Sequence, residues 1–194
     1  MKALNRYITE KFQVSKDYKY QYTYTPKDKK ELIECIKEKI EKEGLGTKDE
    51  PLDLNNIDVS NIIDMSYLFD ADYETLHGLS LTLNGYFDIS DWDVSNVENM
   101  RNMFYKSNFN GDISDWNVRK VKDMHWMFRL SKFDGDISGW DVSNVENMEA
   151  MFMFSQFTGK KGDITKWNTK NVKYMQSMFD DCPLEDNPPK WYKE

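Results

Sequence analysis

The chain has 194 residues, of which 39% are hydrophobic and 14% aromatic, and its formal net charge is −8. This supply of core-forming residues excludes a chain that is disordered throughout. No run of about 18 apolar residues occurs, so neither a membrane-spanning helix nor a membrane partner is expected.

Residues 1–50 contain no copy of the repeat that follows, and we expect them to form a small α+β cap. A strand is indicated by tyrosines that alternate with other residues, namely Tyr18, Tyr20, Tyr22 and Tyr24. A helix should follow, with Thr25 as its cap, Pro26 in its first position and Gly44 beyond its end. The tyrosine row suits a half-buried edge strand, with a ligand-stacking surface as the alternative.

Residues 51–182 repeat one phrase, which reads WDVSNVENMRNMF in its first clear copy. Four copies, numbered here repeats one to four, begin at Trp92, Trp116, Trp140 and Trp167, and a weaker leading copy begins at Ile57. The tryptophans lie 24, 24 and 27 residues apart, a period typical of leucine-rich-type solenoids. Since one repeat cannot bury its apolar residues alone, we expect an α/β solenoid of leucine-rich-repeat-like coils of about 24 residues.

Within each repeat we expect a turn and a short extended segment, followed by one or two helical turns. Helical spacing, at i, i+3, i+6 and i+7, is found in Val97, Met100, Met103 and Phe104. The return to the next repeat is marked by glycines that suit a positive φ or a close backbone approach, Gly111, Gly135 and Gly162. Residues 183–194 should cover the open apolar face of repeat four.

Two polar residue types recur at fixed positions of the repeat. Carboxylates recur at Asp88, Asp112, Asp136 and Asp163. Stacked about 4.8 Å apart they would repel by roughly 1 kcal/mol per pair in water, which turn N–H groups can offset. We therefore favour structural Asx turns, with a cation-binding ladder as the alternative, and expect no cofactor and no resident metal. A second ladder, interrupted by Lys120, is expected to satisfy loop backbone through Asn96, Asn144 and Asn171.

Residues 51–91 contain no Lys or Arg and carry a net charge of −8, which equals that of the whole chain. This acidic block argues against direct nucleic-acid binding. It would instead suit the basic channel of a nucleic-acid enzyme, reached by electrostatic steering. Its candidate partner-binding residues are Asp58, Asp64, Asp70 and Asp72.

Repeat two departs from the other copies. Trp126 occupies the position of small or polar residues elsewhere, so it is either additional packing or an exposed anchor. Cationic and aromatic-ring neighbours in the same repeat are Arg119, Lys122, His125 and Arg129. Arg101 and Glu149 align with His125 in the adjacent repeats and would line the same face. The mixed charge of this face favours protein recognition.

The phrase Asp-Ile-Ser-x-Trp-Asp-Val-Ser-Asn-Val-x-x-Met-x-x-Met-Phe resembles the BspA-like leucine-rich repeats of bacterial surface proteins, also described as mycoplasma-type repeats, over roughly residues 52–180. The resemblance implies a right-handed solenoid that binds other macromolecules. The opening residues lack the apolar stretch of an export signal, unlike the surface adhesins. The chain is more similar to short intracellular members of bacteria and phages, which implies a cytoplasmic location in a bacterial cell, with a phage-encoded origin as the alternative.

Catalysis is not expected, because the two histidines belong to no metal-binding spacing and no phosphate loop or nucleophile elbow is present. The leading expectation is a non-catalytic protein–protein interaction solenoid that is a monomer or a weak homodimer. One alternative is a phage- or mobile-element-encoded acidic inhibitor of a host nucleic-acid enzyme or defence protein, similar in role to anti-CRISPR proteins. Another is a cation-stabilised structural repeat protein.

Overall fold

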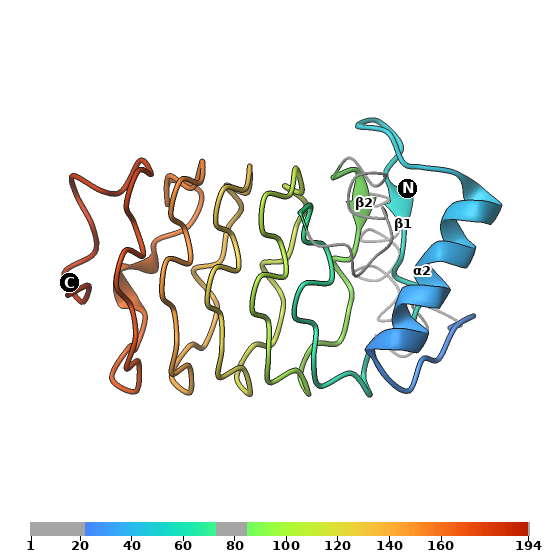
Figure 1. Ribbon diagram of the computed structural model, residues 1–194, viewed down its shortest axis with the longest axis horizontal. Helices are drawn as coiled ribbons and strands as arrows, with labels where there is room; N and C mark the ends of the chain where they lie inside the picture. The colour runs from blue at the N-terminus through green and yellow to red at the C-terminus, as the bar shows by residue number, and fades with distance from the viewer. Residues whose placement is uncertain (1–21, 73–84, 194) are drawn as a thin grey trace, which may run out of the picture.

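The computed structural model describes residues 22–72 and 85–193 (Figure 1). Within them the regular elements are the helix α2 (Lys29–Glu43), the strands β1 (Leu52–Asp53) and β2 (Phe87–Asp88), and the short 3-10 helix η3 (Ile164–Lys166). The two strands pair in parallel, with Leu52 opposite Phe87. No described helix is long and apolar enough to cross a membrane.

The expected fold class, an α/β solenoid of right-handed leucine-rich-repeat-like coils, is wrong. Most of the described chain is neither helix nor strand, and the one sheet has two strands and does not close. Of the expected α+β cap, the described residues show only α2 and a bridge from Tyr24 to Ile57. Tyr18 and Tyr20 lie outside the described residues. The repeats instead form irregular turns that lie side by side, an arrangement we refer to as the repeat stack (Figure 1).

Helix α2 begins three residues later than expected from Thr25 and Pro26. Asp28 is its N-cap, because the Asp28 carboxylate accepts a hydrogen bond from the Glu31 amide at 2.9 Å. The Glu31 carboxylate accepts in turn from the Lys27 amide at 2.9 Å, one residue before the N-cap. Gly44 ends the helix as expected.

Backbone hydrogen bonds between neighbouring repeats hold the stack together. In repeat two, the amides of alternate residues donate to repeat three: Met124 to Asn147 O at 2.9 Å, Trp126 to Glu149 O at 3.1 Å and Phe128 to Met151 O at 2.9 Å. In the opposite direction, the Glu146 amide of repeat three donates to the Lys122 carbonyl of repeat two at 2.8 Å. The same pattern joins the leading copy to repeat one and continues to repeat four.

The helical turns expected in each repeat are absent from the described copies, because two positions in each of repeats one to four, and one in the leading copy, adopt left-handed backbone. The first of these positions is occupied by Tyr67, Asn102, Trp126, Ala150 and Ser177. The second is occupied by Lys106, Leu130, Phe154 and Asp181. A left-handed residue other than glycine costs roughly 1–2 kcal/mol. The inter-repeat bonds offset this cost, since a right-handed helix would turn the same amides back into their own repeat.

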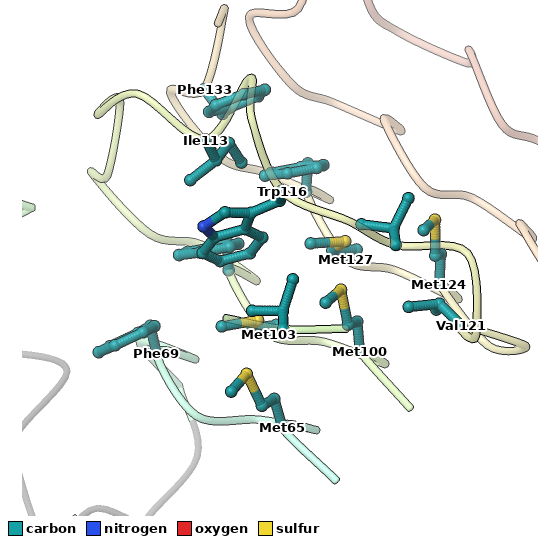
Figure 2. Close-up of a cluster of buried hydrophobic side chains, with 14 of the residues drawn as sticks. Met65, Phe69, Met100, Met103, Ile113, Trp116, Val121, Met124, Met127 and Phe133 are labelled. Carbon is teal, nitrogen blue, oxygen red and sulfur yellow. The ribbon is translucent and has the colours of Figure 1, made fainter. Parts of the chain in front are cut away.

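The core is a set of parallel side-chain ladders that run through the repeats (Figure 2). Phe128 stacks between Phe104 and Phe152, with ring centroids 5.4 and 5.7 Å away, and all three rings are fully buried. The Trp140 indole N–H donates to the Ile113 carbonyl at 3.1 Å. Equivalent indole bonds are made by Trp92, Trp116, Trp167 and Trp191. Each indole thus satisfies a buried carbonyl of the preceding turn while packing in the core.

The two polar ladders expected from the sequence are confirmed as backbone-satisfying groups. Each ladder carboxylate accepts from the amide two residues later, at 2.9 to 3.1 Å, in Asp88, Asp112, Asp136 and Asp163. The Asn144 side-chain amide donates to the Arg119 carbonyl at 2.8 Å, and two further asparagines of its ladder act alike. At the break in that ladder, Lys120 donates to the Asn96 side chain at 2.6 Å.

The expected glycine positions are needed for close approach, not for positive φ. A Cβ at Gly135 would lie 2.6 Å from the Phe133 ring, and one at Gly111 would lie 2.7 Å from the Phe109 ring. Neither of these glycines has positive φ. The glycine therefore lets the chain return directly over a buried phenylalanine.

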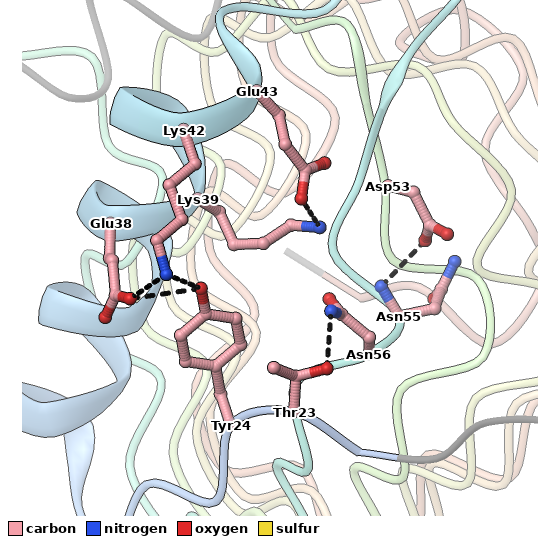
Figure 3. Close-up of polar contacts among 9 residues, drawn as sticks. All are labelled: Thr23, Tyr24, Glu38, Lys39, Lys42, Glu43, Asp53, Asn55 and Asn56. Atoms are coloured by element: carbon pink, nitrogen blue, oxygen red, sulfur yellow. Dashed lines mark hydrogen bonds and ion pairs between the residues drawn. The ribbon is translucent and has the colours of Figure 1, made fainter.

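Helix α2 covers one end of the stack, and residues 183–193 lie at the other (Figure 1). The Lys29 ammonium donates to the Ser66 carbonyl at 3.1 Å and to the Asp64 carboxylate at 2.9 Å. Figure 3 shows further polar contacts near α2, among them the Lys39–Glu43 ion pair at 2.6 Å. At the far end, Trp191 stacks on Trp167 at 6.0 Å.

We predict that Trp140→Phe lowers the free energy of unfolding by about 2–4 kcal/mol, because it removes one of the two hydrogen bonds that the Ile113 carbonyl accepts and leaves a cavity in the core. Urea denaturation followed by circular dichroism measures the change. Ile63→Val, at an exposed apolar side chain, should change stability by less than about 0.5 kcal/mol. Equal stability of Trp140→Phe and the wild type would contradict the proposed role of the indole ladder.

Candidate functional site

Repeat two carries a surface on which cations lie over aromatic rings. The Arg129 guanidinium lies 4.3 Å from the Trp126 ring centroid and 5.8 Å from that of Tyr105. The Tyr105 and Trp126 rings stack at 5.9 Å, and the His125 ring meets the Trp126 ring edge-on at 4.9 Å. Arg129 is therefore held against two rings from adjacent repeats.

The same arrangement continues toward the leading copy. The Arg101 guanidinium lies 5.8 Å from the Tyr67 ring, and the Lys106 ammonium lies 5.4 Å from the Tyr105 ring. We define the cation–aromatic surface as these residues and the exposed apolar side chains at its border: Tyr67, Arg101, Tyr105, Lys106, His125, Trp126, Arg129, Leu130 and Phe154.

The left-handed positions explain why this surface is exposed. The second left-handed position of each repeat, which we call the second column, is exposed in repeats one to four. Leu130 and Phe154 accordingly present 38% and 43% of their surfaces to solvent. The first column buries small side chains, such as Asn102 and Ala150. An indole does not fit that buried space, and Trp126 is accordingly only partly buried and lies over Tyr105. Both readings of Trp126, additional packing and exposed anchor, therefore describe part of its environment.

Positive charge on this surface is incompletely compensated. Lys106 pairs with Asp72. No ion pair to Arg101 or Arg129 occurs within residues 22–72 and 85–193. The cation–π contacts leave the guanidinium edges available for a carboxylate, since an arginine can stack and donate in its plane at the same time.

Three buried polar atoms of this region have no hydrogen-bond partner among the described residues: His125 Nε2, Arg129 Nε and Asn102 Oδ1. An unpaired buried polar group costs about 1–3 kcal/mol, and native proteins contain few of them. Their gathering around Trp126 marks this region as one that an additional polar partner would stabilise.

Burial lowers the pKa of His125 below its ordinary value of 6.5, and the nearby Arg101 charge lowers it further. Glu149 and Asp123 act in the opposite direction but do not outweigh these two effects. His125 is consequently neutral at pH 7. Arg101 and Glu149, which the sequence aligns with His125, thus both act on the His125 pKa through their charges.

Arg119 and Lys122, which the sequence analysis grouped with Trp126, lie in a different environment. Arg119 pairs with Asp141 at 2.9 Å, and Lys122 pairs with Glu98 at 2.7 Å. Both line a shallow groove of alternating charges that contains no residue of the cation–aromatic surface. Their charges are already neutralised by neighbouring repeats, so we do not include them in the candidate site.

The carboxylates of the acidic block are used within the chain. Asp64 pairs with Lys29 at 2.9 Å, and Asp72 pairs with Lys106. Asp58 and Asp70 each accept from the amide two residues later, and Asp70 is only 2% exposed. Most of the insertion between the leading copy and repeat one, residues 73–84, lies outside the described residues.

Five members of the surface were not predicted from the sequence: Tyr67, Tyr105, Lys106, Leu130 and Phe154. The available signal was an apolar residue at a position that is charged in other repeats, as in Leu130 and Phe154 against Lys106 and Asp181. That signal is readable only once the second left-handed column is known to be exposed.

A family model matches residues 75–191, and its description is "Mycoplasma protein of unknown function, DUF285". The match covers repeats one to four and the closing segment with Trp191. No curated protein and no solved structure matches the chain.

We predict that part of the acid sensitivity of this protein comes from His125. Its folded-state pKa is depressed, so as the pH falls below about 6.5 the unfolded chain takes up a proton that the native state does not. The free energy of unfolding therefore decreases as the pH falls from about 6.5 toward the lower pKa of the folded state. His125→Gln, which copies Gln176 of repeat four, should lose less melting temperature than the wild type between about pH 7.5 and about pH 5. Equal losses in the two proteins would contradict this assignment.

Proposed function

The chain belongs to this Mycoplasma family of unknown function, and we propose that it is a non-catalytic protein-binding module that acts through the cation–aromatic surface. The family description names no activity, so the proposal is supported by the surface itself. The resemblance of the repeats to BspA-like proteins, which bind other macromolecules, agrees with it.

The observation that carries the proposal is the placement of Arg129 against Trp126 and Tyr105, 4.3 and 5.8 Å from their ring centroids. Tryptophan, tyrosine and arginine are the residue types most enriched among binding hot spots. Here they are held in place before binding, which lowers the entropy lost when a partner docks. Leu130 and Phe154, at the second left-handed position of repeats two and three, add exposed apolar area.

The chemistry of the surface favours an acidic protein segment as the partner. A carboxylate of that segment would meet the guanidinium edge of Arg129 or Arg101, and an adjacent apolar side chain would cover Leu130 and Phe154. Because Arg101 is exposed and Arg129 is partly exposed, association should weaken as the salt concentration rises.

The acidic inhibitor is the less favoured function. The carboxylates on which it depends are engaged by Lys29, Lys106 and backbone amides. Two of these charges, those of Asp64 and Asp72, are compensated by lysines of the same chain, which weakens the attraction of the acidic block to a basic channel. The cation-stabilised structural role is likewise not favoured, since the ladder carboxylates already accept turn amides.

We predict that Trp126→Asn abolishes partner capture without unfolding the protein. Asparagine is the residue of repeat one at this position, where it is buried at φ 55°, so the backbone should accept it. Loss of a hot-spot tryptophan weakens binding by about 30-fold or more. The measurement is affinity capture from the source cells by wild-type and variant proteins, with quantitative mass spectrometry and then titration of the purified partner.

The matched control is Arg119→Ser, which copies Ser95 and Ser143 and removes a cation from the charged groove. It should retain the partner at wild-type levels. The proposal fails if Trp126→Asn binds as tightly as the wild type, or if Arg119→Ser loses the partner instead.

A further inference from the structure

Repeat four presents backbone groups that its counterparts use to bind the next repeat. In repeat two, the Lys122 carbonyl accepts from the Glu146 amide at 2.8 Å, and the Met124 amide donates to Asn147 O at 2.9 Å. The equivalent groups of repeat four are the Lys173 carbonyl and the Met175 amide. Neither has a hydrogen-bond partner among residues 22–72 and 85–193.

These two groups point away from the stack for a simple geometric reason. Tyr174 forms a parallel bridge with Asn147, in which the Tyr174 amide and carbonyl both bond to repeat three. In an extended segment the flanking carbonyl and amide face the opposite side. The Lys173 carbonyl and the Met175 amide are therefore an acceptor and a donor on one open edge.

The side chains of this edge are also less covered than their counterparts. Val145 and Met148 of repeat three are fully buried, whereas Val172 and Met175 are only partly buried. Trp191 and Tyr192 pack on Trp167 and Phe179, which leaves the edge itself uncovered by the closing segment.

Tyr174 is itself a departure from the repeat. The other copies have Asp or Asn there, and those side chains accept from the amide two residues later, as Asn147 does from Glu149 at 3.0 Å. Tyr174 makes no such cap and exposes 53% of its surface. In repeat four, the copy with the open edge, the aromatic side chain of Tyr174 thus replaces a turn-forming Asp or Asn.

The opposite end of the stack is not available to receive this edge. The Ser66 carbonyl is the leading copy's counterpart of an acceptor used between repeats, and Lys29 of α2 already occupies it at 3.1 Å. End-to-end addition of copies would require displacing α2. The open edge can, however, pair with the same edge of a second copy. It carries an acceptor, the Lys173 carbonyl, before Tyr174 and a donor, the Met175 amide, after it.

We propose that two copies of this chain pair through residues 173–175, antiparallel and about a two-fold axis at Tyr174. Each Met175 amide donates to the Lys173 carbonyl of the second copy, and the two Tyr174 side chains face each other at a non-hydrogen-bonded position. Antiparallel pairing places residues at such a position about 4.5 Å apart at Cα. The pair also covers Val172 and Met175 of both copies.

The contact is small, with two reciprocal hydrogen bonds and one aromatic pair, so the dimer is weak and depends on concentration. It lies in repeat four and includes no member of the cation–aromatic surface. The dimer can therefore be tested independently of the proposed function, and Trp126→Asn should leave it unchanged.

Sedimentation velocity over a range of concentrations tests the dimer, with Tyr174→Asp as the main variant. Aspartate copies Asp123, so it should restore the turn cap and keep the fold. It also sets two carboxylates against each other at the two-fold axis, which should weaken dimerisation by about tenfold or more. Tyr86→Asp, at another exposed tyrosine, is the matched control and should dimerise like the wild type.

Disulfide cross-linking provides a second test of the dimer. Tyr174→Cys should form an intermolecular disulfide under mild oxidation, because the expected Cα separation is within the range that a disulfide spans. Lys170→Cys, off the axis, should cross-link far less, and the wild type controls for Cys35 and Cys182. A monomeric wild type at all concentrations, or equal cross-linking of the two variants, would overturn the proposal.

Discussion

The structure depends on hydrogen bonds that each repeat makes to its neighbour and not to itself. Amides of alternate residues, such as those of Met124, Trp126 and Phe128, all donate to the following repeat. A single repeat would leave these groups unpaired, and its Trp, Met and Phe side chains would be exposed on both sides. Stability is therefore a sum over neighbouring pairs of repeats, and the two ends need separate solutions.

This constraint also determines where the protein can vary. The ladder positions are fixed by core packing, since their side chains are fully buried in successive repeats. The left-handed positions are required by the hydrogen-bond pattern, but those of the second column face solvent and accept Lys106, Leu130 or Phe154 alike. A binding surface can thus be built on them without disturbing the stack, and in repeats one to three it combines cations, aromatic rings and exposed apolar side chains.

The sequence allowed the ladders to be predicted, because they are positions at which the copies of one phrase agree. It also singled out Trp126 as a candidate, because this residue departs from the other copies. It did not allow the secondary structure of the repeats to be predicted, although the helix that ends at Gly44 was predicted to within three residues. The spacing of Val97, Met100 and Phe104 is helical, yet the chain is turned by Asn102 and Lys106 in left-handed backbone, where most copies have neither Gly nor Asn. The fold class was wrong for this reason. The same backbone sends Arg119 and Trp126 to different surfaces, which sequence proximity could not reveal.

Amide hydrogen exchange measured by NMR tests whether the repeats are held together by hydrogen bonds to their neighbours. We predict strong, similar protection of alternate amides in repeats one to three, including those of Met100, Met124 and Met148, because each donates to the next repeat. The Met175 amide of the monomer, which has no such acceptor among the described residues, should exchange much faster. Protection confined to helix α2, with rapid exchange throughout the repeats, would contradict this prediction.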